Sequence, residues 1–363
     1  MRHFAPISLL SLVLLALLPL APAGTSAAAD TVPAPPLAER YRAVLHGGFA
    51  RAANTVMTCG DVMVDDAVPC ADAQAGQAAA SGQYAMTYVD TDDDPNTYDS
   101  SAAELRLPAG ARVDYARIYW SANISVGEEK APADNPRILL AEPGGRYREI
   151  LADDTAGDVT AEDGSLYTAS ADITELVRYA GGRGPWTVGQ VNAAAGNSPA
   201  GGWGGWTIVA AFEHPDEPLR ELVLWDGLAT AGRGSPVELT ATGLDVPAGA
   251  EGRLGLVAGG GERVPDGADG GDRVTVSAPG APPTVLHDAA NPGTDVLNGT
   301  VADLGRATAG RDPAHAHTLG YDSDVLDLTG ALEPGADRLS VAFGGGRDAY
   351  HLSAVFLQTA ARQ

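Results

Sequence analysis

The segment Trp206-Thr-Ile-Val-Ala-Ala-Phe-Glu213, followed closely by Leu219-Arg-Glu-Leu-Val-Leu-Trp-Asp-Gly227, decides the fold class of this chain. Both stretches are short and rich in β-branched and aromatic residues, which is typical of buried strands. Similar stretches recur along the chain, separated by many of its 45 glycines and 25 prolines. The sequence therefore predicts an all-β protein. Further strands are expected at 112–121, 186–192, 237–244, 253–258, 272–277, 337–343 and 350–359.

Two β-sandwich domains in succession are predicted, each jelly-roll-like. The roughly 330 residues that follow position 29 exceed the usual size of one domain, and a break in composition at Ala231-Gly-Arg-Gly-Ser-Pro236 marks the boundary. The first domain spans 45–232 and contains one short helix, which Asp172 caps and Gly181 ends. The second domain spans 233–363.

The N-terminus has the order of segments found in secretory signal peptides. A basic start precedes an apolar stretch of 14 residues, Ile7 to Leu20, and Ala27-Ala28-Ala29 offers small residues for cleavage. A membrane anchor is the alternative, but a spanning helix needs about 20 apolar residues. We predict a signal peptide at 1–29, a flexible leader at 30–44, and a mature chain that is secreted or loosely held at the cell surface and does not span the membrane.

Charge limits the classes of partner. The chain has 47 acidic residues against 23 basic ones, a net charge of −24. Such a charge disfavours nucleic acid and anionic membranes as partners and makes divalent cations plausible ligands. The two cysteines, Cys59 and Cys70, most simply form one local disulfide in an oxidising compartment, since a zinc site would need more nitrogen or sulfur ligands nearby.

Several motifs together resemble a known family. They are the stretch Tyr88 to Ala111, then Ala116-Arg-Ile-Tyr-Trp120, Gly205 to Glu213 followed by Leu219 to Gly227, Asp295-Val-Leu-Asn-Gly-Thr300, and Leu319 to Leu328. Across roughly residues 45–360 the chain is similar to the β-rich N-terminal module of large bacterial surface proteins, which often precedes adhesin-like repeats. The resemblance implies a role outside the cell and assigns no chemistry.

The acidic loop, Asp90 to Asp99, is the strongest candidate metal site. Its side-chain oxygens come at nearly alternate positions, which suits calcium with its six to eight oxygen ligands. The alternative is a solvated loop between strands. The candidate calcium ligands are Asp90, Asp92, Asp94, Asn96 and Asp99.

Two further groups of polar side chains stand out. His315 and His317 share a face of an extended segment and could hold zinc or copper if His287 or His351 joined them. The aspartates Asp322, Asp324 and Asp327 are expected to cap backbone amides in turns.

Trp203, within Gly201-Gly-Trp-Gly-Gly-Trp206, is a candidate sugar-stacking residue, whereas Trp206 should belong to the core. No nucleophile-elbow or phosphate-loop motif occurs. We therefore expect an extracellular, adhesin-like structural or binding protein without catalysis, whose ligand is a cell-wall component or a glycan. A lectin-like carbohydrate-binding protein and a secreted hydrolase with an unrecognised site are the alternatives.

Overall fold

Strands dominate the part of the chain that the computed structural model describes, which is Met1 and residues 37–362 without 162–163, 182, 233, 266–267, 269–270 and 346–348. The expected signal peptide, apart from Met1, and residues 30–36 of the expected leader lie outside this part. By its contacts, Pro33–Gln363 forms one compact unit. The prediction of an all-β protein is confirmed.

The largest sheet has eleven strands in the order β18-β17-β20-β14-β22-β12-β1-β11-β5-β9-β8. Strand β1 (Ala38–Thr55) joins its two halves, because residues 38–46 pair with β12 and residues 47–55 pair with β11. The other strands of this sheet are β5 (Arg112–Asn123), β8 (Asp154–Ala161), β9 (Gly164–Asp172), β11 (Gly204–Glu213), β12 (Leu219–Gly232), β14 (Gly252–Gly259), β17 (Val301–Asp303), β18 (Arg306–Ala307), β20 (Tyr321–Asp327) and β22 (Ala349–Ala360).

Three smaller sheets complete the described part. The first holds β19 (Arg311–Asp312), β4 (Ser100–Leu105), β10 (Gly184–Gly189), β6 (Arg137–Ala141) and β7 (Arg148–Leu151). The second holds β13 (Val237–Thr242), β21 (Arg338–Gly344), β15 (Arg273–Ser277) and β16 (Thr284–Val285), and the third pairs β2 (Met57–Val62) with β3 (Tyr84–Tyr88). The helices are α1 (Cys70–Gln74) and α2 (Thr174–Ala180), with short 3-10 turns at Ser81–Gln83, Pro132–Asp134 and Thr329–Ala331.

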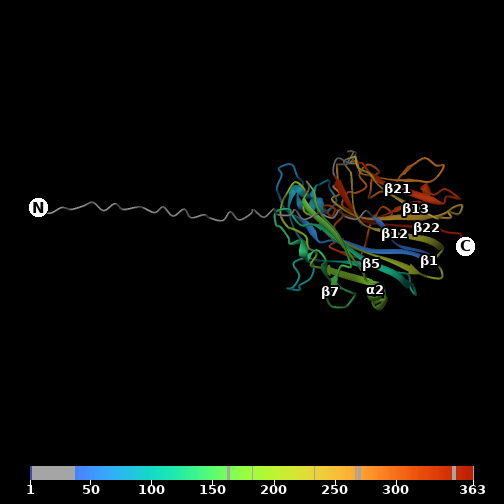
Figure 1. Cartoon of the computed structure of the whole chain (residues 1–363), viewed down its shortest axis with the longest axis horizontal. Coiled ribbons are helices and arrows are strands. Elements are labelled where there is room, and N and C mark those ends of the chain that lie inside the picture. The colour runs from blue at the N-terminus through green and yellow to red at the C-terminus, as the bar shows by residue number, and fades with distance from the viewer. Residues whose placement is uncertain are drawn as a thin grey trace. The chain divides into compact units, whose positions relative to one another are not determined.

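The sheets stack in layers with a separate apolar core between neighbours. One core lies between the β11–β5 half of the large sheet and the sheet of β4, β10 and β6, and contains Trp120 and Trp186. A second lies between the β12–β22–β14 half and the sheet of β13, β21 and β15, and contains Phe343 and Tyr350. A third cluster, with Tyr119 and Phe356, joins the two halves. From top to bottom in Figure 1, the labelled strands are β21 and β13, then β22 and β12, then β1 and β5, and finally β7.

All nine expected strands are present; β12 runs to Gly232, past the expected end at Gly227, and the ends of the others shift by at most three residues. The expected helix is α2, where Asp172 Oδ1 accepts the Thr174 amide at 2.8 Å and Gly181 ends the helix with a φ of 76°. Two expectations were wrong. A second helix, α1, also occurs, and residues 38–44 of the expected flexible leader are paired with β12 in β1. The placement of a domain boundary near 232 stays a prediction.

Candidate functional site

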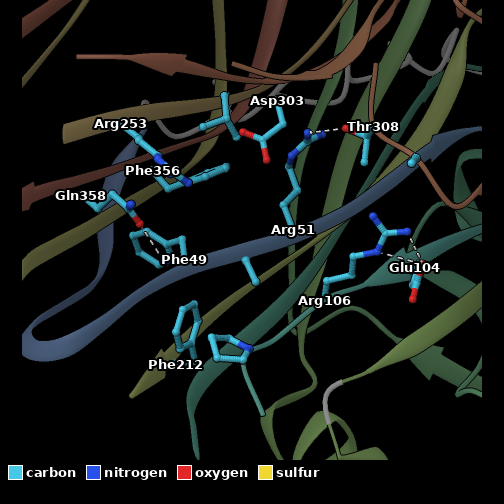
Figure 2. Close-up of a pocket in the computed structure, with 14 residues that line it drawn as sticks. Phe49, Arg51, Glu104, Arg106, Phe212, Arg253, Asp303, Thr308, Phe356 and Gln358 are labelled. Carbon is cyan, nitrogen blue, oxygen red and sulfur yellow. Dashed lines mark hydrogen bonds and ion pairs between the residues drawn. The ribbon is translucent and has the colours of Figure 1, made fainter. Parts of the chain in front are cut away.

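A cavity of about 290 Å³ opens where β1, β11, β22, β14 and β17 meet. Its lining combines aromatic rings with charged groups, and Figure 2 shows these side chains converging from strands far apart in the sequence. A neighbouring hollow of about 520 Å³ shares Arg106, Arg253, Asp303 and Thr308 with it and adds Arg306. We call the cavity and the hollow together the arginine groove.

Aromatic rings form the inner wall of the groove. Phe49 on β1 and Phe356 on β22 meet edge to face, with their ring centroids 5.4 Å apart. Phe356 is 4% exposed and Phe212 is 7% exposed, so Phe49 is the ring that is more open to solvent. The Gln358 amide oxygen is held by the backbone NH of Phe49 at 2.8 Å, which fixes the direction of this amide. The inner wall therefore consists of packed aromatic rings and one amide, that of Gln358, whose direction is fixed by a hydrogen bond.

Arg51 on β1 links the strands that line the groove. Its guanidinium donates to Ser323 O, to Ser323 Oγ at 3.0 Å, to Ala302 O at 2.9 Å and to Thr308 Oγ1 at 3.0 Å. Figure 2 shows Asp303 beside this guanidinium. Burial lowers the pKa of Arg51 from its ordinary value, although nearby carboxylates, among them Asp303 and Asp324, act in the opposite direction. Arg51 thus binds three segments together and is the least solvated charge of the groove.

The other arginines of the groove are more accessible. Arg106 pairs with Glu104 at 2.5 Å, and this partner raises the pKa of Arg106. Arg253 and Arg306 are exposed and make no side-chain hydrogen bond or ion pair with any residue that the structure describes. Four arginines therefore face two carboxylates, Glu104 and Asp303, in a chain whose net charge is −24. This local excess of positive charge suits an anionic ligand.

The acidic loop expected to bind calcium is hydrogen-bonded both within itself and to neighbouring segments, although Asp99 Oδ2 is buried without a partner. Asp92 accepts from the Asp94 amide at 2.8 Å and from the Tyr147 hydroxyl, and Asp94 accepts from the Asn96 amide at 3.0 Å. Asp90 accepts from Ser100 Oγ at 2.8 Å, and Asp99 is buried, with one oxygen accepting from the Val191 amide at 3.1 Å. No three of these aspartates, nor any other three His, Cys, Asp or Glu among the described residues, gather as metal ligands. Calcium binding by this loop stays a prediction.

The disulfide between Cys59 and Cys70 is confirmed. It joins β2 to the start of α1 with the two Cα atoms 5.6 Å apart, within the range expected for a disulfide.

Trp203 does not form the exposed platform that the sequence suggested. It is 3% exposed and stacks on the His351 ring, with centroids 6.4 Å apart. Glycine makes this burial feasible, because a Cβ at Gly259 would lie 2.1 Å from the Trp203 ring. Trp206 is fully buried, as expected.

The histidine pair is not joined by a third metal ligand among the described residues. His317 is 1% exposed, and burial lowers its pKa to about 3. The three aspartates of β20 do cap backbone amides, as expected. Asp322 accepts from Gly299 N, Asp324 from Ala302 N, and Asp327 from Thr329 N, each at 2.8 Å.

Sequence reasoning missed the arginine groove. Its four arginines come from separate segments of the chain, so no spacing relates them. The available signal was composition: with 23 basic residues against 47 acidic ones, a place where several arginines gather is unusual in this chain.

Comparisons with known proteins yield only distant likenesses. No family model matches the chain, and no curated protein matches it. Among solved structures, PNGase F, a glycosylasparaginase from Flavobacterium meningosepticum, is 14% identical over 85% of this chain and 97% of its own, with a TM-score of 0.24. The structure of Sulfolobus turreted icosahedral virus is 9% identical over 72% and 86%, with a TM-score of 0.21, and BuGH86 in complex with neoagarooctaose is 11% identical over 77% and 36%, also at 0.21. TM-scores this low carry no argument about activity. No described helix is long and apolar enough to cross a membrane.

Proposed function

We propose that this chain is an extracellular, non-catalytic binding protein that holds an anionic glycan in the arginine groove. The observation that carries the proposal is the pair Arg253 and Arg306, exposed and without a carboxylate partner among the described residues of a strongly acidic protein. Guanidinium groups bind carboxylates and sulfates through paired hydrogen bonds. Phe49 and the oriented amide of Gln358 supply the apolar and polar contacts that a sugar ring uses.

The extracellular part of the proposal rests on the signal-like N-terminus and on the disulfide, since disulfides persist mainly in oxidising compartments. Binding without catalysis is proposed because the two carboxylates of the groove already have basic neighbours. Glu104 pairs with Arg106, and Asp303 lies beside Arg51, so neither is poised as a free acid and base pair. An adhesin-like role at the cell surface, as the family resemblance implies, fits such binding.

A glycan-binding screen of the mature chain tests the proposal. We expect binding of uronate- or sulfate-bearing glycans and little binding of neutral ones, with affinity that falls as salt rises. The double variant Arg253→Ala/Arg306→Ala should lose at least tenfold in affinity, about 1.4 kcal/mol. The matched control is Arg146→Ala/Arg338→Ala, which removes two exposed arginines that do not line the groove.

Equal losses in the two double variants would mean that net charge alone, rather than the groove, governs binding. Tight binding of neutral glycans that survives Arg253→Ala/Arg306→Ala would overturn the proposal. Shortened glycan products after long incubation would show a hydrolase instead.

A further inference from the structure

Two aspartates of β20 are buried on the same face of the strand. Asp322 and Asp324 are each 0% exposed, and residues two apart in a strand point the same way. In each carboxylate one oxygen accepts backbone amides, whereas Oδ2 is buried and has no hydrogen-bond partner. Gly261 packs close to Asp322, because a Cβ at Gly261 would lie 2.5 Å from Asp322 Oδ2 and 2.4 Å from Leu297 O, so that no larger side chain fits there.

Neutral oxygens gather beside this pair. The hydroxyl of Thr300 lies 2.8 Å from Asn291 Oδ1, 3.1 Å from Asn298 Oδ1 and 3.1 Å from Asp324 Oδ1. A hydroxyl has one proton, so it can serve only one of these three oxygens. The Asn298 amide is fixed with its oxygen inward because its Nδ2 donates to Ala290 O at 2.9 Å. These acceptor oxygens therefore lie close together with too few hydrogen-bond donors to satisfy all of them.

Two further side chains leave polar atoms unsatisfied at this place. Asn291 is 0% exposed, and its Nδ2 has no partner, while its oxygen points at Thr300. Asp288 accepts the amides of Ala290 and Asn291 through Oδ1, both at 2.9 Å, and its Oδ2 is buried without a partner. Buried polar atoms without a partner, such as this amide donor and this carboxylate acceptor, are rare in folded proteins unless an ion or a water meets them.

We propose that the oxygens of Asn291, Asn298, Thr300 and Asp324 bind a calcium ion, with amide and hydroxyl oxygens in place of a cluster of three carboxylates. The donor set consists of carboxylate, amide and hydroxyl oxygens, which calcium accepts in six- to eightfold coordination, whereas zinc prefers nitrogen and sulfur. An approach from solvent exists, because a cavity of about 700 Å³ is lined by Asn298, Thr300 and Asp295. This site is separate from the acidic loop and from the proposed glycan contact.

Thermal melts of the mature chain at pH 8, in chelator and in millimolar calcium, test the site. We expect calcium to raise the wild-type midpoint by about 2–5 °C. Asp324→Asn replaces the carboxylate with a neutral isostere. It should melt above the wild type in chelator and lose most of the calcium shift. Asp327→Asn, an exposed cap on the same strand, is the matched control and should keep the shift.

Two direct measurements keep the proposal open to refutation if a variant folds poorly. Equilibrium dialysis of the Asp92→Ala/Asp94→Ala chain, in which the acidic loop is disabled, should still find one bound calcium per chain. The calcium shift of the wild type should shrink toward pH 5, because protons compete for the same oxygens. No bound calcium in that chain, or a full calcium shift in Asp324→Asn, would overturn the proposal.

Discussion

Replacing Arg51 by Met is the sharpest test of how the groove is held together. Arg51 joins β1 to β20, to β17 and to Thr308 through four hydrogen bonds from a single charged group. Met keeps much of the apolar volume and loses the donors. The carbonyl oxygens of Ser323 and Ala302 would then lose their side-chain partner inside the protein.

The magnitude follows from opposing contributions. A hydrogen bond to a charged group contributes about 1.5–3 kcal/mol, so four such bonds give a gross loss of about 6–12 kcal/mol. Removing the guanidinium also removes the several kcal/mol that its desolvation costs. We therefore expect a net loss of about 3–5 kcal/mol in the free energy of unfolding, typical of breaking a buried charged network.

Urea denaturation at pH 7 measures this loss, and Arg253→Met is the matched control. Arg253 also lines the groove but has no described side-chain partner, so its substitution should change stability by less than about 0.5 kcal/mol. Arg51→Met should thus lower the midpoint of unfolding, while both variants weaken binding of an anionic glycan. A stability loss below about 1 kcal/mol in Arg51→Met would refute the view that Arg51 anchors the groove.

Three further outcomes are expected. Removing the disulfide with Cys59→Ser and Cys70→Ser, which opens a link across 11 positions, should cost roughly 3 kcal/mol in urea denaturation, and an unchanged midpoint would show that the link contributes nothing. Trp203→Ala should lower the free energy of unfolding by about 3–5 kcal/mol through the cavity it leaves, without changing glycan affinity measured at a temperature where the variant is folded; a selective loss of affinity would restore Trp203 as a ligand contact. If the acidic loop binds calcium as the sequence predicts, Asp92→Ala with Asp94→Ala should bind one calcium fewer per chain in equilibrium dialysis, and an equal number would leave this segment as a solvated loop.

The strands were predictable because their signal is local. In β11 and β22 nearly every residue is buried and most are apolar, so local composition reveals both strands. The start of β1 carries no such signal, since residues 38–44 mix charged and apolar side chains. They form a strand because β12 pairs with them and because Arg40 bonds Asp226 at 2.9 Å. This stabilisation comes from residues about 190 positions away and is invisible in a local window.

The candidate sites were harder to predict for the same reason. Trp203 lies in a glycine-rich segment that reads as an exposed loop, yet Gly259 and Gly320 on other segments leave the space that buries it. The arginine groove is assembled from strands that meet only in the folded sheet. Conversely, the capping roles of Asp322 and Asp324 were predictable, but their unpaired oxygens depend on the loop at 288–300, which sequence could not place against β20.

The two proposed sites share a structural element, and this has a thermodynamic consequence. Arg51 donates to the carbonyl oxygens of Ala302 and Ser323, while the Ala302 amide donates to Asp324 Oδ1. The strands β17 and β20 therefore carry the groove's anchor on one side and the cation cluster on the other. If calcium binds as proposed and holds these strands in place, it should also pre-organise Arg51, and linkage then requires the effect to be reciprocal. A glycan bound in the groove would then tighten calcium binding by the same factor as calcium tightens glycan binding.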